Sequence, residues 1–329
     1  MKLFYSLFLL LICTNLQAQE LFPNTEPAST IPKGALGLRF MDETFTEYGT
    51  LRNQFALRAM YGLGSRLTVM VQSDFSNHHD TILPRNLLTH THPTPGTVSY
   101  TTVAKTYGRE YPYLFGGFYG YVKYRFYAKD EQQRHLRMAL YAAASSTNVA
   151  HDEAEPGLQG DTKGFGGGVI ITRLIHRFAA SLTTGFVIPG TYHDFRMDYS
   201  LQPPDGPALY TDITYGNAFD YNLSFGYLLY PSVYKDYKQT NINVYLELIG
   251  RSYDAAKITR NGNVAIPQTP TLQKGNYVDA IPGVQAILNS NTRIDFSVGF
   301  SLINRSYRYF TPVYLLGIQH YFYFKKHSS

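Results

Sequence analysis

Apolar and polar side chains alternate at every second position along several stretches of the chain. In residues 66–75, Leu67, Val69, Val71 and Phe75 share one face, and Thr68, Met70, Gln72 and Asp74 share the other. Residues 218–230, 240–253 and 292–303 repeat this alternation. Successive side chains of a β-strand point to opposite faces, whereas a helix repeats every 3.6 residues. The pattern therefore predicts strands.

The same alternation, followed through the whole chain, predicts about twelve strands. They lie near residues 34–43, 51–62, 66–76, 112–126, 135–147, 164–174, 177–189, 218–230, 240–253, 277–288, 292–303 and 312–324. Each is about as long as the roughly 9–11 residues that a tilted strand needs to cross a bilayer. Every second link is short, as at 289–291, while the links between are mostly long, as at 77–111. Short turns at one rim and long loops at the other are typical of bacterial outer-membrane barrels.

The alternative is a soluble β-sandwich or barrel, which turns its apolar face inward. Here the polar face carries Gly, Ser, Asn and Arg, while the apolar face is rich in Phe, Tyr and Leu. A closed sheet of about twelve strands is too wide to fill with apolar side chains, so its apolar face points outward into lipid. We predict an all-β protein in which residues 34–324 form a transmembrane antiparallel up-and-down β-barrel, with short periplasmic turns and long extracellular loops.

Composition agrees with a barrel and excludes several other classes. Charged residues make up 16% of the chain and aromatic residues 15%, with 29 Tyr and no Trp, while the mean hydropathy of −0.22 excludes a helical membrane protein. Tyrosines crowd residues 111–127 and 227–237, as expected of side chains at the two membrane interfaces, although some belong to an ordinary core. The net charge of +5 is dispersed, so we expect no nucleic-acid partner.

The N-terminus is typical of a secretory signal peptide, with Lys2, an apolar run over 3–13 and a small-residue cleavage site at Ala18. The run is too short to anchor the chain as a helix. Lipoprotein processing at Cys13 is the alternative, but Ile12 stands where a small residue is expected. We assign 1–18 as a signal peptide; Cys13 is the only cysteine, so the mature chain would have no thiol chemistry.

Two segments flank the predicted barrel. Residues 19–33 contain three prolines and are excluded from being a regular strand. They form either a periplasmic tail or a plug inside the lumen. At the other end, residues 321–324 are aromatic and look like the C-terminal strand by which the outer-membrane assembly machinery recognises its clients, although a tail at 325–329 follows. Phe322 and Phe324 share parity with His320, which leaves the register of this strand open.

Charged residues on the polar face are candidates for lining the lumen. They are Arg39, Arg58, Asp74, Lys123, Arg125, Arg137, Glu247, Arg251, Asp279, Arg293 and Asp295. Rings of charge in a pore tune which small solutes pass. The alternative is a plugged barrel in which Arg–Asp and Arg–Glu pairs brace the wall.

Histidines concentrate in the long loops, next to carboxylates. The candidate metal ligands are His78, His79, His90, His92, His151, Asp152 and Glu153, and His193 precedes Asp194 in a third loop. Imidazole and carboxylate together bind Zn, Cu or Ni, and His90 and His92 would share a face of an extended chain. Chance accumulation in polar loops is the alternative. Loops that bind a divalent metal or a partner are therefore a second hypothesis, and no other cofactor is expected.

Catalysis has little support in the sequence. No strand carries the His-x-Ser arrangement of the outer-membrane phospholipase. His78, Asp80, His151 and Asp152 could gather at a rim as in an outer-membrane protease, but any loop-rich barrel could assemble such a set. We therefore predict no catalytic residue and no enzyme.

Three motifs resemble a known family. They are residues 22–28 followed by Pro32-Lys33-Gly34, Tyr61-Gly62-Leu63 with Leu67-Thr68-Val69, and residues 150–156. These are similar to Bacteroidetes outer-membrane proteins and to the transporter-like barrels of the MetA pathway of phenol degradation, distant relatives of the hydrophobic-compound channels. The resemblance covers most of the mature chain and supplies no site residues. It implies a Gram-negative outer-membrane channel for a small molecule, with apolar and aromatic compounds as candidates, working by passive diffusion through the lumen.

Overall fold

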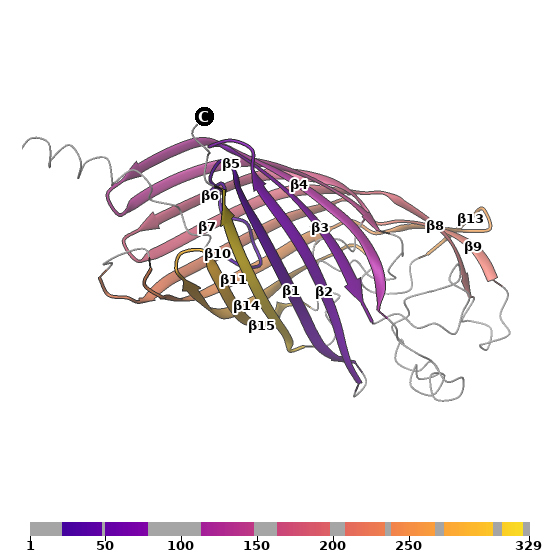
Figure 1. Cartoon of the computed structure of the whole chain (residues 1–329). Helices are drawn as coiled ribbons and strands as arrows, with labels where there is room; N and C mark the ends of the chain where they lie inside the picture. The colour runs from indigo at the N-terminus through magenta and orange to yellow at the C-terminus, as the bar shows by residue number, and fades with distance from the viewer. Residues whose placement is uncertain are drawn as a thin grey trace, which may run out of the picture.

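The computed structural model describes residues 22–47, 50–77, 113–147, 163–197, 208–233, 238–266, 273–304 and 311–324. Twelve strands close into a barrel (Figure 1). They are β1 (Ala35–Glu47), β2 (Thr50–Gly62), β3 (Leu67–Ser76), β4 (Leu114–Glu131), β5 (Arg134–Thr147), β6 (Gly164–Ile175), β7 (Phe178–Pro189), β10 (Ala218–Tyr230), β11 (Asn241–Tyr253), β14 (Gly275–Leu288), β15 (Thr292–Ile303) and β16 (Val313–Tyr323). The predicted fold class is confirmed, and the predicted strands match the observed ones to within a few residues.

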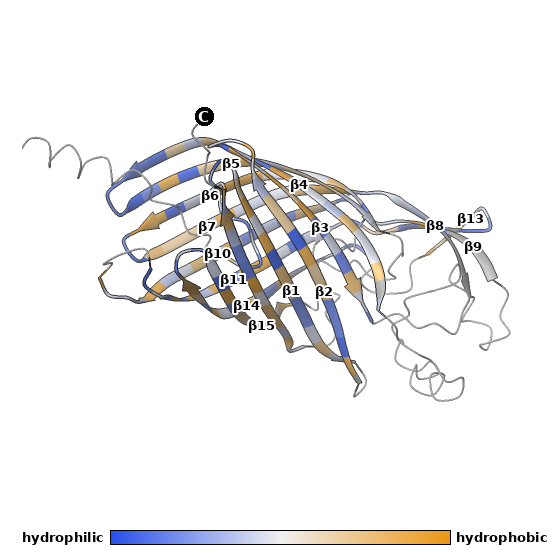
Figure 2. Cartoon of the chain, viewed as in Figure 1, coloured by the Kyte–Doolittle hydropathy of each residue, from blue (hydrophilic) through white to orange (hydrophobic). Residues whose placement is uncertain are grey.

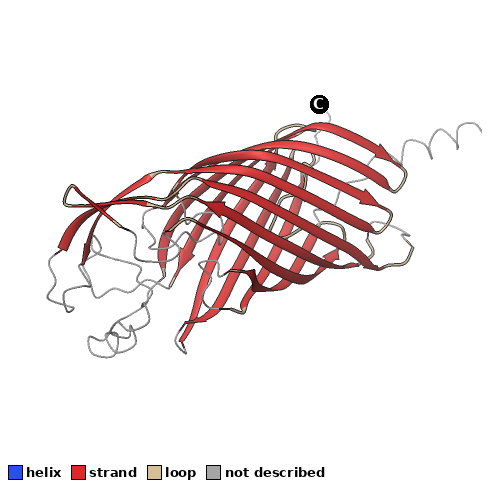
Figure 3. Cartoon of the chain, turned by 180° about the vertical axis from the view of Figure 1, so that it is seen from behind, coloured by secondary structure: helices blue, strands red, loops and turns tan. Residues whose placement is uncertain are grey.

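Each barrel strand pairs with its neighbours in chain order, and β16 pairs antiparallel with β1 to close the wall. Seen from behind, the wall continues as tilted strands throughout (Figure 3). Closure gives every wall strand a hydrogen-bonded neighbour on both sides. No strand edge therefore leaves unpaired backbone N–H and C=O groups in the hydrocarbon core of the membrane. The described residues include no helix long and apolar enough to cross a membrane.

Hydrophilic and hydrophobic residues alternate along the strands of the wall (Figure 2), and their exposure shows that this alternation is the inside–outside pattern of the barrel. On β3, the side chains of Gln72 and Asp74 are 0% and 1% exposed, while Val71, which directly precedes Gln72, is 57% exposed. Phe186 is 64% exposed on the outer face of β7. An outer face of large apolar side chains is solvated by lipid rather than by water. The barrel is therefore an outer-membrane protein.

A second sheet extends the long-loop rim of the barrel (Figure 1). It contains β8 (Thr191–Met197), β9 (Ala208–Thr214), β12 (Lys257–Arg260) and β13 (Asn263–Ala265), in the order β13-β12-β9-β8. A small core holds it together: Tyr192, Ile213, Tyr215, Ala256 and Ile258. The alternation predicts no strand there, because these strands are only three to seven residues long and lie within the links predicted as long loops.

The register of the last strand is settled by two residues at its end. Tyr321 faces inward and is 4% exposed, whereas Phe322 faces outward and is 42% exposed. His320 shares the outer face with Phe322, with the two ring centroids 4.6 Å apart. Its Nδ1 lies 2.8 Å from the hydroxyl of Thr292 on β15. This hydrogen bond gives an imidazole on the lipid face a polar partner.

Candidate functional site

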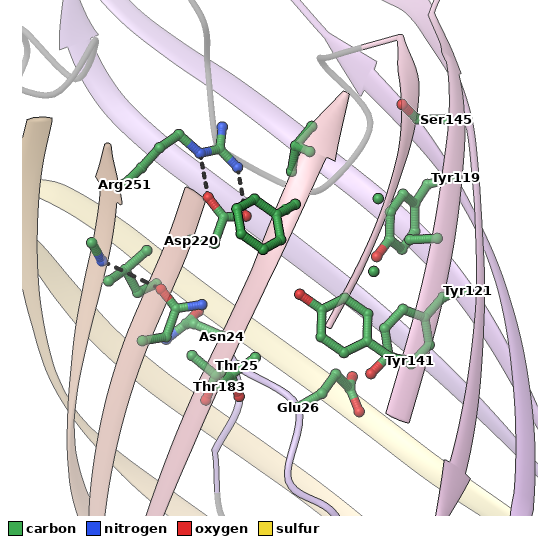
Figure 4. A pocket seen from close by; sticks show the side chains of 18 of the residues that line it. Asn24, Thr25, Glu26, Tyr119, Tyr121, Tyr141, Ser145, Thr183, Asp220 and Arg251 are labelled. Atoms are coloured by element: carbon green, nitrogen blue, oxygen red, sulfur yellow. Dashed lines mark hydrogen bonds and ion pairs between the residues drawn. The ribbon is translucent and has the colours of Figure 1, made fainter. Parts of the chain in front are cut away.

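Residues 22–33, called the N-terminal segment below, lie inside the barrel. Phe22, Ala28 and Ile31 are 3%, 0% and 3% exposed. The segment joins β1 at the short-turn rim, where the N–H of Gly34 donates to the carbonyl of Gly62 over 2.8 Å. Asn24, two residues after Phe22, lies deep in the lumen beside β11 (Figure 4). The segment therefore occupies the lumen from the level of Asn24 to the short-turn rim.

One carboxylate anchors the deep end of the segment. The Glu247 carboxylate accepts hydrogen bonds from the Asn24 side-chain amide over 2.6 Å, and from the Thr25 N–H and hydroxyl over 2.8 Å each. The Thr25 hydroxyl also lies 2.8 Å from the hydroxyl of Ser224 on β10. Glu247 is 0% exposed. A buried carboxylate requires hydrogen-bond donors, and here the segment supplies them.

Glu26 fixes the segment on the other side of the lumen. Its carboxylate lies 3.1 Å from Arg58 on β2 and 3.0 Å from Lys123 on β4. Lys123, which is 1% exposed, also donates to the carbonyl of Pro27 over 2.8 Å. Both cations are thereby paired within the barrel.

Three further contacts tie the rest of the segment to the wall. Arg137 on β5 donates to the Ser29 hydroxyl over 3.1 Å. The N–H of Ala28 donates to Thr172 on β6, and the N–H of Ile31 donates to Thr68 on β3. Together with Glu26 and Glu247, these contacts reach strands from β2 to β11. The segment is thus held by side chains of the wall rather than by strand pairing.

On the long-loop side of the segment lies a space that we call the tyrosine chamber (Figure 4). It measures about 1360 Å³, part of which is open to solvent. Pro23, Asn24, Thr25 and Glu26 line its floor. Tyr119 and Tyr121 of β4 and Tyr141 of β5 form one side; the first two ring centroids are 6.3 Å apart and the last two 5.5 Å apart, with interplanar angles of 27° and 21°. These are offset-stacked aromatic geometries.

The opposite side of the chamber carries an ion pair (Figure 4). Arg251 of β11 donates through Nε and Nη2 to the two carboxylate oxygens of Asp220 on β10, over 2.6 and 3.1 Å. The two residues are directly opposite in the strand register. Asn222 and Thr183 add polar atoms to the lining, and the rest includes an aliphatic set of Met41, Ile249, Ile281 and Leu315. The chamber thus joins an aromatic wall to a charge-compensated polar wall.

Gly185 on β7 makes room for one of the tyrosines. A Cβ added to Gly185 would lie 2.1 Å from the hydroxyl oxygen of Tyr141 and 2.7 Å from the carbonyl oxygen of Gly167. Any larger residue would displace the Tyr141 ring. The aromatic wall therefore depends on a glycine two strands away.

The eleven candidate lumen residues all belong to barrel strands. Nine are buried: Arg39, Arg58, Asp74, Lys123, Arg137, Glu247, Asp279, Arg293 and Asp295. Arg251 lines the chamber, and Arg125 reaches the short-turn rim, where it donates to the Ser65 carbonyl over 2.9 Å. Arg39 pairs with Asp295 over 2.9 Å. Some of these charges therefore brace the wall, and others meet the N-terminal segment or the chamber.

Several site residues were not among the candidates. Asp220 shares the parity of Ser224, and Tyr119 and Tyr121 share that of Lys123, so their inward position was available from the alternation. The sequence assigns the tyrosines of 111–127 to the membrane interfaces or, for some of them, to a core; Tyr121, which is 7% exposed and lines the chamber, is one of the buried ones. Tyr124, at 46% exposed, does face outward.

The candidate metal ligands lie outside the described residues. They are His78, His79, His90, His92, His151, Asp152 and Glu153. Within the described ranges, no three His, Cys, Asp or Glu side chains gather as a metal site would require. The Nδ1 atom of His193 on β8 lies 2.7 Å from the carboxylate of Asp212 on β9, and these two residues form a pair.

Comparisons with known proteins bear on the fold. No family model and no curated protein matches the sequence. An outer membrane channel from Pseudomonas putida F1 matches in structure with a TM-score of 0.52 and 13% identity, over 91% of this chain and 100% of that one. The chain shares the fold of that channel.

Two further solved structures are more distant. The NanC porin matches with a TM-score of 0.42 and 9% identity, over 87% of this chain and 98% of that one. The CymD monoaromatic hydrocarbon channel matches with a TM-score of 0.37 and 10% identity, over 90% of both chains. Because both TM-scores are below 0.5, neither structure adds to the conclusion about the fold.

Proposed function

We propose that this protein is an outer-membrane channel through which small molecules diffuse passively, and that the N-terminal segment is its plug. The observation that carries the proposal is the position of the tyrosine chamber, above a segment that side chains alone hold in the lumen. Apolar and aromatic compounds are the solute candidates, as the resemblance to the MetA-pathway barrels of Bacteroidetes implies. The Pseudomonas channel supports the proposal through its fold.

The contacts of the segment are of a kind that water can replace. Each hydrogen bond contributes roughly 0.5–1.5 kcal/mol, and those to a charged group about 1.5–3 kcal/mol. If the segment moves, Glu247, Arg58 and Lys123 face a lumen that water can enter, so none becomes a buried unpaired charge. The strand pairing of the barrel does not involve the segment. Opening therefore costs local contacts and leaves the wall intact.

The same proposal covers the ends of the chain. Residues 1–18 are a signal peptide removed on export, residues 19–33 contain the plug, and 325–329 form a short tail after the barrel at 34–324. The assembly machinery of the outer membrane recognises the aromatic end of β16. The lumen charges from Arg39 to Asp295 influence which solutes pass.

Liposome swelling tests the channel. Purified, folded protein is reconstituted into liposomes, and the influx of small uncharged solutes is compared with that into protein-free liposomes. We expect swelling that depends on the amount of protein. A folded barrel that conducts neither solute nor ions, with or without its plug, would defeat the proposal.

A further inference from the structure

We propose that the tyrosine chamber binds an uncharged ring compound that carries a hydroxyl group. The inference rests on the proposed function, because it names the class of solute that the channel would hold on its way through. It narrows the candidates by excluding ions and plain hydrocarbons. Three features of the chamber carry it, one for each part of this description.

The aromatic wall favours a ring. Tyr119, Tyr121 and Tyr141 stack along one side of the chamber, and Figure 4 shows their rings beside the open space. Aromatic faces attract rings in stacked or edge-on contact at centroid distances of about 4.5–7 Å. Ile249 and Ile281 belong to the aliphatic part of the lining, against which the remaining edge of a ring can pack.

Charge compensation favours an uncharged solute. Asp220 binds both donor groups of Arg251 that face it, and Glu26 is paired with Arg58 and Lys123. Glu43 also lines the chamber, but it is only 3% exposed and takes part in an interaction of its own. An ion entering the chamber would lose hydration without gaining an uncompensated counter-charge. An uncharged compound avoids that cost.

The tyrosine hydroxyls favour a solute that can form hydrogen bonds. Those of Tyr119 and Tyr141 point toward the open space (Figure 4). The hydroxyl of Tyr121 is buried and makes no hydrogen bond to any residue that the structure describes. Buried hydroxyls normally have a partner, and a hydrocarbon filling the chamber would supply none. A solute hydroxyl both donates and accepts, so it can bind a tyrosine oxygen or Asp220.

Isothermal titration calorimetry on the full chain in lipid nanodiscs tests this, with empty nanodiscs as the reference. The probes are benzyl alcohol, ethylbenzene, benzoate and cyclohexylmethanol, which differ in the hydroxyl, the charge and the aromaticity of the ring. We expect benzyl alcohol to bind roughly tenfold more tightly than ethylbenzene or benzoate. Binding of cyclohexylmethanol at similar affinity would support a general ring site, and weaker binding would support an aromatic one. Ethylbenzene or benzoate binding as well as benzyl alcohol would overturn the proposal.

Two conservative variants locate the site. Tyr119→Phe/Tyr141→Phe keeps both rings and removes their hydroxyls, and it should reduce the preference for benzyl alcohol over ethylbenzene roughly fivefold to tenfold. Tyr245→Phe is the matched control, since Tyr245 is 5% exposed inside the barrel and is not part of the chamber lining. It should keep the preference. An unchanged preference in the double variant would overturn the site.

The binding and conduction measurements distinguish a failure of this inference from a failure of the proposed function. A barrel that conducts solutes but shows no preference for hydroxyl-bearing rings overturns this inference and leaves the channel standing. A barrel that binds benzyl alcohol but never conducts supports the chamber and defeats the proposed channel.

Discussion

Glu247 on β11 and Thr25 in the N-terminal segment, 222 residues apart in the chain, meet through two hydrogen bonds of 2.8 Å to one carboxylate oxygen. The contact joins the wall of the barrel to the deep end of the segment. Asn24 adds a third short hydrogen bond, to the other oxygen. Because no cation pairs with Glu247 in these contacts, its negative charge is balanced by donors that belong to the segment itself.

The variant Glu247→Gln should loosen the plug. Glutamine keeps the size of the side chain but removes the charge and replaces one acceptor oxygen with an NH2 donor. The hydrogen bonds from Thr25 weaken to neutral strength and the bond from the Asn24 side chain to the other oxygen is lost, at a cost of about 1 kcal/mol or more. We expect the open state to be populated roughly fivefold to tenfold more often in single-channel recordings. Glu131→Gln, a change to an exposed residue paired with Lys129, is the control. Equal opening frequencies in the two variants would contradict the anchor.

The variant Glu26→Gln should change ion selectivity as well as opening. It removes the carboxylate that Arg58 and Lys123 share, so the lumen gains one net positive charge. We expect the reversal potential in a KCl gradient to shift toward that of chloride, and the shift to shrink as ionic strength rises because salt screens the charges. A shift toward potassium would show that Glu26 does not set the charge of the path.

Removal of residues 23–31 should open the lumen and preserve the barrel. The wall closes through pairing of β1 with β16, which begins at Ala35 and does not include the deleted residues. We expect conductance several times that of the intact chain, together with a lower unfolding temperature from the lost contacts. Heat-modifiable migration on gels checks that the variant is folded. A folded deletion variant with unchanged conductance would mean that the segment is not the plug.

The sequence predicts the strands of the barrel wall much better than it predicts the segment and the side chains inside the lumen. The strands follow from local alternation: every strand of the wall has an inward and an outward face, and Gln72 and Val71 differ in exposure as their parity requires. The path of the N-terminal segment does not follow from any local pattern, because it is irregular and its partners, such as Thr172 and Glu247, are distant in the chain. Parity places Asp220 and Arg251 on the inner face, but only the strand register places them opposite each other.

The variant Gly185→Ala should close part of the tyrosine chamber. The added Cβ would lie 2.1 Å from the Tyr141 hydroxyl oxygen, so the ring must move or the strands must separate. Overpacking of this kind costs about 1–3 kcal/mol. We expect a lower unfolding temperature and weaker binding of benzyl alcohol. Gly64→Ala is the matched control, since a Cβ there meets no atom within 4 Å. Equal effects of the two substitutions would contradict the packing of Tyr141 over Gly185.

The variant Asp220→Asn should convert the chamber from a site for uncharged solutes into one that accepts anions. Asparagine keeps a hydrogen bond to Arg251 but carries no negative charge, so the lining of the chamber gains one net positive charge. A carboxylate forms charge-assisted hydrogen bonds with a guanidinium, so benzoate can bind Arg251 beside the asparagine. We expect benzoate affinity to rise roughly tenfold or more, measured by calorimetry in nanodiscs, and to fall again as salt is added.

Two further variants separate this effect from a general change in charge. Asp254→Asn removes a carboxylate that is 64% exposed and pairs with Lys274, so it should leave benzoate binding unchanged. Asp220→Asn/Arg251→Gln removes both members of the chamber pair and should abolish the gain, because no cation is left to bind the anion. If the double variant binds benzoate as tightly as the single one, Arg251 is not the group that recognises it. Compensation of Arg251 by Asp220 would then not be what excludes anions from the chamber.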